Sequence, residues 1–299
     1  MDRVVVVGSL NMDINFSVPH IPTVGETIIA TGMSLHRGGK GANQAVAIAR
    51  LGGNVEMIGA VGNDENGTLI IEGLKEEKVG IEGLMVKEGT PTGTAIISVA
   101  ENGDNNIIVH SGANYQLGKE DIDKNIELIK SARYCVLQLE IPYEVVKYTI
   151  DICYENDVKV IFNPAPAVTN IDVDMLSRVE YFLPNESELN IIAGKTVTEE
   201  NILETCREII GKGCRNVIVT LGERGSLWVT ESEHKYFEAL KVNAVDTTAA
   251  GDSFIGAFTF MLARGNDTAE AIKFATRAAA VTVTRKGAQD SLPVLAEVL

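Results

Sequence analysis

The sequence contains few of the residues that build metal clusters, disulfide frameworks or dithiol sites. Its 299 residues include only four cysteines and four histidines. The cysteines have no Cys-x-x-Cys spacing and the histidines are scattered, which argues against a zinc site or dithiol chemistry. We therefore expect the thiols to be reduced and mostly buried, as in a cytosolic protein.

Basic residues are also scarce. The 26 lysines and arginines are outnumbered by 41 aspartates and glutamates, which gives a formal net charge of −15 at pH 7. Because nucleic-acid binding requires positive patches that displace counterions from phosphates, we expect no nucleic-acid partner. The sequence also lacks an apolar run of 18 residues and a signal-peptide pattern, so we expect a cytoplasmic location and no membrane contact.

What the chain does contain is a regular alternation of apolar strands and helices, typical of a parallel sheet covered by helices on both faces. We find no linker or internal repeat, so we predict one α/β domain over residues 1–299, with a central, mostly parallel sheet in an αβα sandwich. The predicted strands are 3–8, 57–62, 134–139, 158–163, 180–183 and 216–220; the predicted helices are 45–51, 65–77, 119–131, 143–156, 186–193, 199–212, 254–262 and 268–283.

One part of the chain interrupts this alternation. Asn102-Gly103 separates two β-rich runs, 94–100 and 106–110, and is a strong hairpin signal. Residues 14–36 show no helical periodicity and are expected to form short strands outside the main layers. We predict that segments of about 13–36 and 92–110 together form a small β-sheet lid.

A short stretch of small and polar residues, 246–252, precedes the apolar run 254–262. The first turn of a helix has unpaired N–H groups and a partial positive charge, so this stretch predicts an anion site. Asp252 could take a proton from a hydroxyl beside that site. Alternatively, Asp252 is only the N-cap of the helix.

A second glycine-rich stretch, 37–44, opens the helix whose body is 45–51. Three glycines in four residues leave backbone open to a ligand, and Asn43 can project from the first turn. The stretch matches neither a P-loop nor a GxGxxG fingerprint. A purely structural loop explains it as well.

Further candidates stand where strands end. Open α/β sheets bind ligands at the carboxyl ends of their strands, so side chains at these positions are expected to line one cleft. Acceptor groups suit a polyhydroxylated ligand and glycine-lined turns suit phosphates, which together favour a sugar and a nucleotide. The candidates are Asn11 and Asp13, Glu140, Asn185 and Glu188, and the turn 220–225. For three of them a structural role remains the alternative: an Asx turn at Asn11 and Asp13, a capping pair at Asn185 and Glu188, and a plain glycine turn at 220–225.

Two of these stretches, 38–43 and 246–252, resemble the two signatures of the PfkB carbohydrate-kinase family. The resemblance covers the whole chain, including 8–13, 185–188 and 284–289. It implies that ATP phosphorylates the 5-hydroxyl of D-ribose, giving D-ribose 5-phosphate and ADP, with Mg²⁺ and an activating K⁺. A related kinase for deoxyribose, another sugar or a nucleoside is the alternative. A catalytically silent sugar-binding or regulatory protein would be expected to lack Asp252 or the anion site.

The resemblance also implies roles for individual residues. Asp252 would be the base, with a backbone anion hole at Ala249, Ala250 and Gly251. The sugar pocket would consist of Asn11, Asp13, Gly39, Lys40, Asn43, Glu140 and Asp252. ATP would contact Asn185, Thr220, Leu221, Gly222, Glu223, Arg224, Gly225, Gly251 and Thr276. Glu188 would be associated with Mg²⁺. The K⁺ positions would be Asp246, Thr248, Thr282, Arg285, Gly287 and Ser291, several through backbone carbonyls.

Thr276 departs from some relatives, in which a larger ring-bearing residue would lie beside adenine. The resemblance further implies that the lid covers the sugar pocket and forms the interface of a homodimer.

Overall fold

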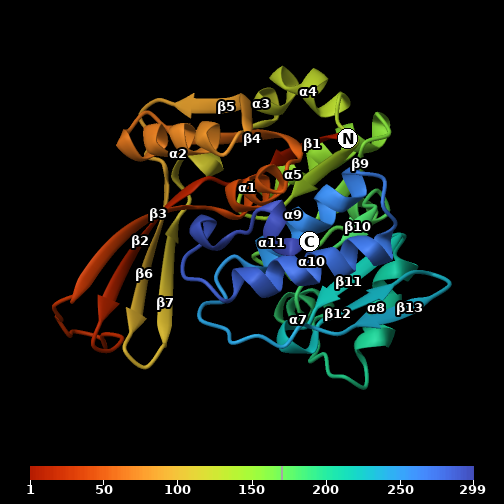
Figure 1. Ribbon diagram of the computed structural model, residues 1–299. Coiled ribbons are helices and arrows are strands. Elements are labelled where there is room, and N and C mark those ends of the chain that lie inside the picture. The colour runs from red at the N-terminus through yellow and green to blue at the C-terminus, as the bar shows by residue number, and fades with distance from the viewer. Residues whose placement is uncertain (170) are drawn as a thin grey trace.

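The computed structural model describes residues 1–169 and 171–299. They form a nine-stranded sheet between helical layers and a separate four-stranded sheet that extends from one side of the body (Figure 1). The two-part organisation agrees with the predicted α/β sandwich and smaller sheet.

The strand order in the large sheet is β13-β12-β11-β10-β9-β8-β1-β4-β5. Neighbouring strands from β11 to β5 are parallel, whereas β12 and β13 form an antiparallel edge. The prediction of a mostly parallel sheet is therefore confirmed. The strands are β1 (Arg3–Val7), β4 (Asn54–Gly62), β5 (Gly80–Lys87), β8 (Tyr134–Leu137), β9 (Lys159–Phe162), β10 (Tyr181–Phe182), β11 (Asn216–Thr220), β12 (Ser226–Val229) and β13 (His234–Phe237).

Alternation along β1 shows how both faces of this sheet are buried. Val4 and Val6 belong to one core cluster, which includes α1, α9 and α10, while Val5 and Val7 belong to a second cluster with α5 and α8. Successive side chains of a strand point to opposite faces, so a run of four buried valines requires a helical layer on each side.

The helices are α1 (Lys40–Arg50), α2 (Glu65–Glu76), α3 (Lys119–Lys124), α4 (Ile126–Lys130), α5 (Tyr143–Glu155), α6 (Val173–Leu176), α7 (Glu186–Ala193), α8 (Ile202–Gly211), α9 (Ala250–Ala263), α10 (Thr268–Thr282) and α11 (Leu295–Val298). Short 3₁₀ turns lie at η1 (Gly112–Gln116), η2 (Gly222–Arg224) and η3 (Gln289–Ser291). Among the described residues, no helix has both the length and the apolar character needed to cross a membrane.

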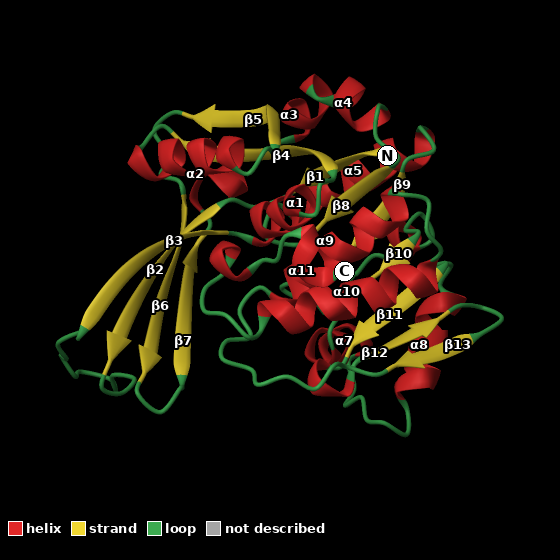
Figure 2. Cartoon of the chain, in the orientation of Figure 1, coloured by secondary structure: helices red, strands yellow, loops and turns green. Residues whose placement is uncertain are grey.

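The small sheet has the order β3-β2-β6-β7, with β2 (Asn11–Val18), β3 (Gly32–Gly38), β6 (Gly93–Ala100) and β7 (Asn105–His110). β2 and β6 are parallel, while the β2–β3 and β6–β7 pairs are antiparallel. The predicted hairpin at Asn102-Gly103 joins β6 to β7. Figure 2 shows the strands leaving the body at one end and running outward together.

Two local predictions were wrong. The single helix expected over 119–131 is divided at Asn125 into α3 and α4, and the helix expected from residue 199 begins at Ile202. In addition, the strands β5, β12 and β13 and the short helices α6 and α11 were not predicted. β5 contains two glycines, and a Cβ at Gly83 would lie 2.6 Å from Ile58 Cγ1, so the glycine permits close packing against β4.

Candidate active site

Polar residues at or just after the carboxyl ends of five neighbouring parallel strands lie at one edge of the large sheet. Along the order β1, β8, β9, β10 and β11 these are Asn11, Glu140, Asn163, Asn185 and Thr220, the last residue of β11. Beside them is a cleft of about 190 Å³, lined by Lys40, Asn163, Ala165, Leu183, Asn185, Glu188, Thr220, Thr247, Ala249, Gly251, Asp252 and Ile255. Seven of these residues were predicted site residues.

Asp252 is buried in the first turn of α9, and each of its carboxylate oxygens accepts a hydrogen bond from α1. Asn43 Nδ2 donates to Oδ2 at 3.0 Å, and Gln44 Nε2 donates to Oδ1 at 2.9 Å. Burial raises the pKa of Asp252, while the Lys40 charge and the two amide donors lower it in part. The N-cap position of α9 belongs to Ala249. The alternative in which Asp252 only caps its helix is therefore wrong.

The backbone at the start of α9 is left open by the turn before it. Ala249 has a left-handed conformation with φ of 58°. Ala250 N donates to Thr247 O at 3.2 Å. The N–H groups of Gly251 and Asp252 lie in the first turn, where no carbonyl of the same helix can accept them. Gly251 and Asp252 both line the cleft, so these donors are available to an anion there.

The start of α1 is packed so closely against residues 8–11, which follow β1, that glycines are required. Gly39 has φ of 89°, and a Cβ on it would lie 2.8 Å from Asn11 N. A Cβ on Gly41 would lie 2.7 Å from Ser9 N. This close approach brings Lys40 N within 3.1 Å of Glu140 Oε2, which also accepts from Ser9 Oγ at 2.5 Å.

Asn11 and Asp13 begin β2 on the far side of this junction. Asn11 is buried and its Oδ1 accepts from Asn114 Nδ2 at 2.8 Å. The Asp13 carboxylate lies against Gly38, and a Cβ there would be 2.2 Å from Asp13 Oδ2. Burial and the negative charge of Glu140 raise the pKa of Asp13 to about 7. This carboxyl group can therefore change its charge near neutral pH.

Lys40 supplies positive charge between these acidic groups. Its burial favours a lower pKa, but nearby carboxylates overcome this effect and raise the pKa above its ordinary value. The carboxylates, in decreasing order of effect, are Asp252, Glu140, Glu188 and Asp13. Lys40 is therefore charged at neutral pH.

Asn185 and Glu188 form a reciprocal capping box at the start of α7. Glu188 N donates to Asn185 Oδ1 at 2.7 Å, and Asn185 N donates to Glu188 Oε2 at 2.8 Å. The capping interpretation is thus correct for both residues. Both also line the cleft. Burial raises the pKa of Glu188, and the hydrogen bond from Asn185 opposes this shift.

The turn 220–225 follows β11 and contains two glycines with positive φ, Gly222 at 61° and Gly225 at 93°. A Cβ on Gly225 would lie 1.9 Å from Phe237 O, so this glycine is needed for the turn to pack against β13. Arg224 pairs with Glu186 and Glu199 at 2.5 and 2.9 Å. Of the six predicted residues in this turn, Thr220 lines the cleft.

The predicted potassium positions come from two loops that hydrogen bonds hold together. Asp246 Oδ1 accepts from Thr248 N and Oγ1 at 2.9 and 2.6 Å, and Asp246 Oδ2 accepts from Gly287 N at 2.9 Å. These bonds outweigh burial and lower the pKa of Asp246. Ser291 is buried and its Oγ donates to Ala288 O at 2.7 Å.

Three predicted residues have other partners for their side chains. Arg285 forms an ion pair with Glu297 at 2.6 Å. Thr282 Oγ1 donates to Ser253 Oγ at 2.7 Å and so joins α10 to α9. Thr276 Oγ1 donates within its own helix to Ile272 O at 2.9 Å, and Thr276 is not among the residues that line the cleft.

Sequence reasoning missed four buried amides near the cleft. Gln44, Gln138 and Asn163 form a connected group beside Asp252, and Asn114 holds Asn11. Gln138 and Asn163 directly follow β8 and β9, so the strand-end pattern that selected Glu140 could have selected them too. Nothing in the sequence separates Gln44 from an ordinary polar residue of a helix.

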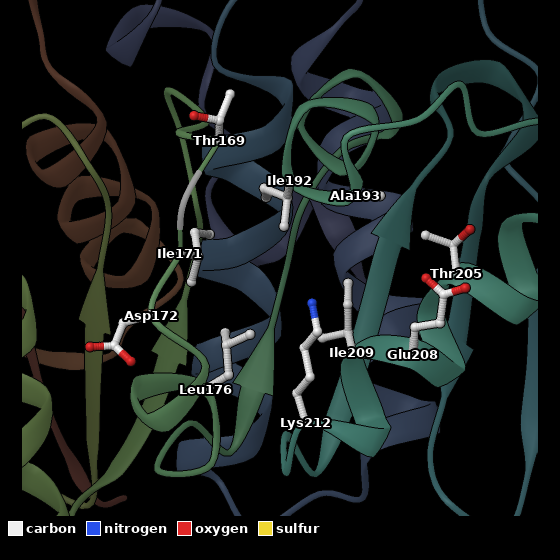
Figure 3. Close-up of a pocket in the computed structure, with 10 residues that line it drawn as sticks. All are labelled: Thr169, Ile171, Asp172, Leu176, Ile192, Ala193, Thr205, Glu208, Ile209 and Lys212. Atoms are coloured by element: carbon white, nitrogen blue, oxygen red, sulfur yellow. The ribbon is translucent and has the colours of Figure 1, made fainter.

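A second cavity, of about 480 Å³, lies between the segment before α6 and helices α7 and α8 (Figure 3). Its walls include the apolar Leu176, Ile192 and Ile209 and the charged Glu208 and Lys212. It shares no lining residue with the cleft and includes no predicted site residue. The predicted site residues that line either cavity therefore all lie in the smaller cleft.

The sequence matches the family model described as pfkB family carbohydrate kinase over residues 1–295. The chain belongs to the pfkB family. It is similar to a deoxyribokinase of Salmonella typhi, with 40% identity over 97% of this chain and 95% of that protein. It is also similar to a ribokinase of Schizosaccharomyces pombe, with 40% identity over 100% of this chain and 97% of that protein.

A solved structure shows the same similarity in three dimensions. Arabidopsis thaliana ribokinase complexed with ribose and ATP matches with a TM-score of 0.93 and 33% identity, over 99% of this chain and 97% of that one. The resemblance found in the two sequence signatures is confirmed over the full fold. This pfkB-family protein is a carbohydrate kinase, a phosphotransferase that uses ATP.

Proposed function

We propose that this kinase transfers the γ-phosphoryl group of ATP to the 5-hydroxyl of D-ribose, giving D-ribose 5-phosphate and ADP. The observation that carries the proposal is the position of Asp252. Its buried carboxylate adjoins the open N-terminus of α9 on one side and the acceptor-rich ends of β1 and β8 on the other.

Asp252 serves as the base in this proposal. Phosphoryl transfer depends on positioning and charge stabilisation more than on covalent chemistry. Asp252 accepts the hydroxyl proton as the oxygen–phosphorus bond forms, and burial raises its pKa toward the range where a base is effective. The backbone at Ala249, Ala250 and Gly251 stabilises the charge on the transferred group.

Asn43 and Asp13 are the strongest candidates for contacts with the sugar. Asn43 Oδ1 is buried and has no hydrogen-bond partner among the described residues, so it is available to a sugar hydroxyl. The Asp13 carboxylate offers two acceptors to two adjacent hydroxyls. D-ribose has such a pair at C2 and C3, whereas 2-deoxyribose does not. Asn11, Gly39, Lys40 and Glu140 complete the proposed pocket.

The groups proposed for ATP lie on the other side of Asp252. Asn185, Thr220 and Gly251 line the cleft. The remaining proposed contacts are the backbone of 221–225 and Thr276, of which Thr276 has the weakest structural support.

The cleft fits Mg²⁺ bound chiefly by ATP. Within the described ranges, no cluster of three or more His, Cys, Asp or Glu side chains could hold a metal by itself. Besides Asp252, which is assigned as the base, Glu188 places a carboxylate in the cleft, and Mg²⁺ commonly binds one carboxylate together with phosphate oxygens and water. The ion would neutralise phosphate charge during transfer.

The loop set around Asp246 fits a potassium ion. Its potential ligands are all oxygens, as hard cations require. They are the Asp246 carboxylate, the hydroxyls of Thr248 and Ser291, and the backbone carbonyls of these residues and of Thr282, Arg285 and Gly287. A bound ion would fix the backbone that leads into α9. We expect turnover to rise when K⁺ replaces Na⁺ at equal ionic strength. Equal rates in the two salts would refute the assignment of a potassium site.

The lid and the homodimer are part of the same proposal. Leu35, Ile14, Ile96 and Ile108 are paired in register across all four strands of the small sheet. Leu35, Ile96 and Ile108 are 51%, 41% and 63% exposed. An apolar row of this kind is expected to be covered by another surface, and we propose a second copy of the chain. The four buried free cysteines fit a cytoplasmic location.

The experiment is identification of the product. Purified protein is incubated with D-ribose, ATP, Mg²⁺ and K⁺, and NMR determines which oxygen carries phosphate. We expect phosphate on the 5-oxygen. In parallel, Asp252→Asn should lower kcat by about 10²- to 10⁴-fold with little change in the Kd of the sugar. A wild-type kcat in that variant would eliminate Asp252 as the base.

A further inference from the structure

Gln44 is a buried side chain that touches Asp252 and has no role in the proposed pocket. Its amide makes three contacts. Nε2 donates to Asp252 Oδ1 at 2.9 Å and to Asn163 Oδ1 at 3.4 Å, and Oε1 accepts from Gln138 Nε2 at 2.7 Å. Both N–H groups and the carbonyl oxygen are therefore used.

A backbone carbonyl fixes which way this amide points. Asn163 Nδ2 donates to Leu183 O at 3.0 Å, and a carbonyl oxygen can only accept. The Asn163 oxygen must therefore face Gln44, so Gln44 must present its NH₂ group to it. If the Gln44 amide were reversed, its oxygen would face the oxygens of Asn163 and Asp252 and its NH₂ would face that of Gln138.

The orientation in which Gln138 donates to Gln44 leaves the side-chain oxygen of Gln138 without a partner. Gln138 Oε1 is buried without a hydrogen-bond partner among the described residues. It lies over Gly8, where a Cβ would be only 2.0 Å away. Buried unpaired acceptors are costly and rare, so their presence calls for a reason. Donation from Gln138 Nε2 to Gln44 provides that reason.

We propose that Gln44, Gln138 and Asn163 form an amide relay that positions Asp252 for proton abstraction. The relay directs one N–H of Gln44 at Oδ1 and, together with Asn43 on Oδ2, holds the carboxylate in one orientation. Gln44 is thus a positioning residue that acts through Asp252. The inference rests on the proposed base role of Asp252.

The relay also favours the ionised form of Asp252, since a donated hydrogen bond stabilises the carboxylate. Four other charged groups act on Asp252 from the surrounding elements: Lys40 of α1, Glu140 after β8, Glu188 of α7 and Asp13 of β2. Removing the Gln44 donor while these charges remain should raise the pKa of Asp252.

The test compares Gln44→Met with Thr259→Val. Methionine has nearly the shape of glutamine but no N–H donor. Thr259 is buried in α9, and its Oγ1 donates to Ile255 O at 2.7 Å without touching Asp252, so Thr259→Val removes a buried hydrogen bond from the same helix. Thermal stability, the Kd of the sugar and kcat against pH are measured for both.

We expect Gln44→Met to lower kcat about ten- to a hundredfold, with sugar Kd nearly unchanged, and to move the acid limb of the kcat profile to higher pH. Thr259→Val should keep the wild-type limb. If both variants lose stability but neither moves the limb, Gln44 is only a structural residue of the core and the inference is wrong.

Two further variants keep the test decisive. Gln138→Met leaves Gln44 in place but removes the donor that holds its Oε1, so the Gln44 amide is held less firmly. It should move the limb in the same direction by a smaller amount; an unmoved limb would overturn the relay. Asp252→Asn tests the underlying function, because an active Asp252→Asn variant would refute the assignment of Asp252 as the base. An inactive Asp252→Asn with a wild-type limb in Gln44→Met would refute the relay alone.

Discussion

Asp13 is the residue through which pH is expected to control sugar binding. Its pKa is raised to about 7, first by burial and then by Glu140, while His36 and Lys40 act in the opposite direction. The ionised carboxylate accepts strong hydrogen bonds through both oxygens, whereas protonation removes the charge and turns one oxygen into a donor. The affinity for the sugar should therefore be highest above the pKa of Asp13 and should decline as the pH falls through that pKa.

The predicted change is about a tenfold weaker Kd for D-ribose at pH 6 than at pH 8, since about a tenth of the carboxyl groups remain ionised one unit below the pKa. Isothermal titration calorimetry without ATP measures it. Asp13→Asn is the control, expected to bind weakly with little dependence on pH. A constant wild-type Kd from pH 6 to 8 would contradict the role of Asp13.

The residues of the site differ in how far the sequence could identify them. Asp252 and Asn43 were predicted from the small-residue stretches around them, and the structure places them in contact. The Gln44 contact was not predictable, because it depends on how α1 and α9 pack. Amides such as Gln138 and Asn163 carry no charge pattern, and burial alone gives them their importance.

At the level of elements, the site depends on the contact between α1 and α9. Gly256 of α9 faces Ala47 of α1, and a Cβ on Gly256 would lie 2.4 Å from Ala47 Cβ. The absence of a side chain at this position lets the two helices approach. The same approach brings Asn43 and Gln44 to Asp252.

Gly256→Ala should therefore push the helices apart and weaken both amide contacts to Asp252. We expect a loss of about 1–3 kcal/mol in the free energy of unfolding, as for overpacked cores, together with a lower kcat. Chemical denaturation and steady-state kinetics measure the two effects. Adding Ala47→Gly removes the clashing methyl group and should restore part of both; a double variant as impaired as the single one would refute this explanation.

The elements themselves were predicted where the local pattern was strong. The sequence predicted α7 and β11 within their observed bounds, because a capping signal or a run of buried β-branched residues marks them. It did not predict β5, an edge strand whose glycines weaken the strand pattern. It also did not predict the helix break at Asn125, where the sequence has no proline or glycine. Such features are set by packing against β4 and α5 rather than by local sequence.

At the scale of the whole molecule, the small sheet should hold two copies together. Ile108→Lys would place a charge in the apolar row that crosses the four strands, and burying an unpaired charge is costly. We expect a dimer for the wild type and a monomer for the variant in analytical ultracentrifugation. Tyr236→Lys is the matched control, because Tyr236 is 53% exposed and lies on β13, an edge strand of the large sheet rather than of the small one. A variant at Ile108 that remains dimeric would show that the row is not the interface.

The choice of sugar decides most directly what this molecule does, because its relatives include both a ribokinase and a deoxyribokinase at 40% identity. The measurement is kcat/KM for D-ribose and for 2-deoxy-D-ribose, from ADP release with Mg²⁺ and K⁺ present. Without its 2-hydroxyl, deoxyribose leaves the partly buried Asp13 carboxylate short of a donor, which penalises the analogue. We expect kcat/KM to be at least about tenfold higher for D-ribose. An equal or higher value for 2-deoxy-D-ribose would contradict the assignment of D-ribose as the substrate.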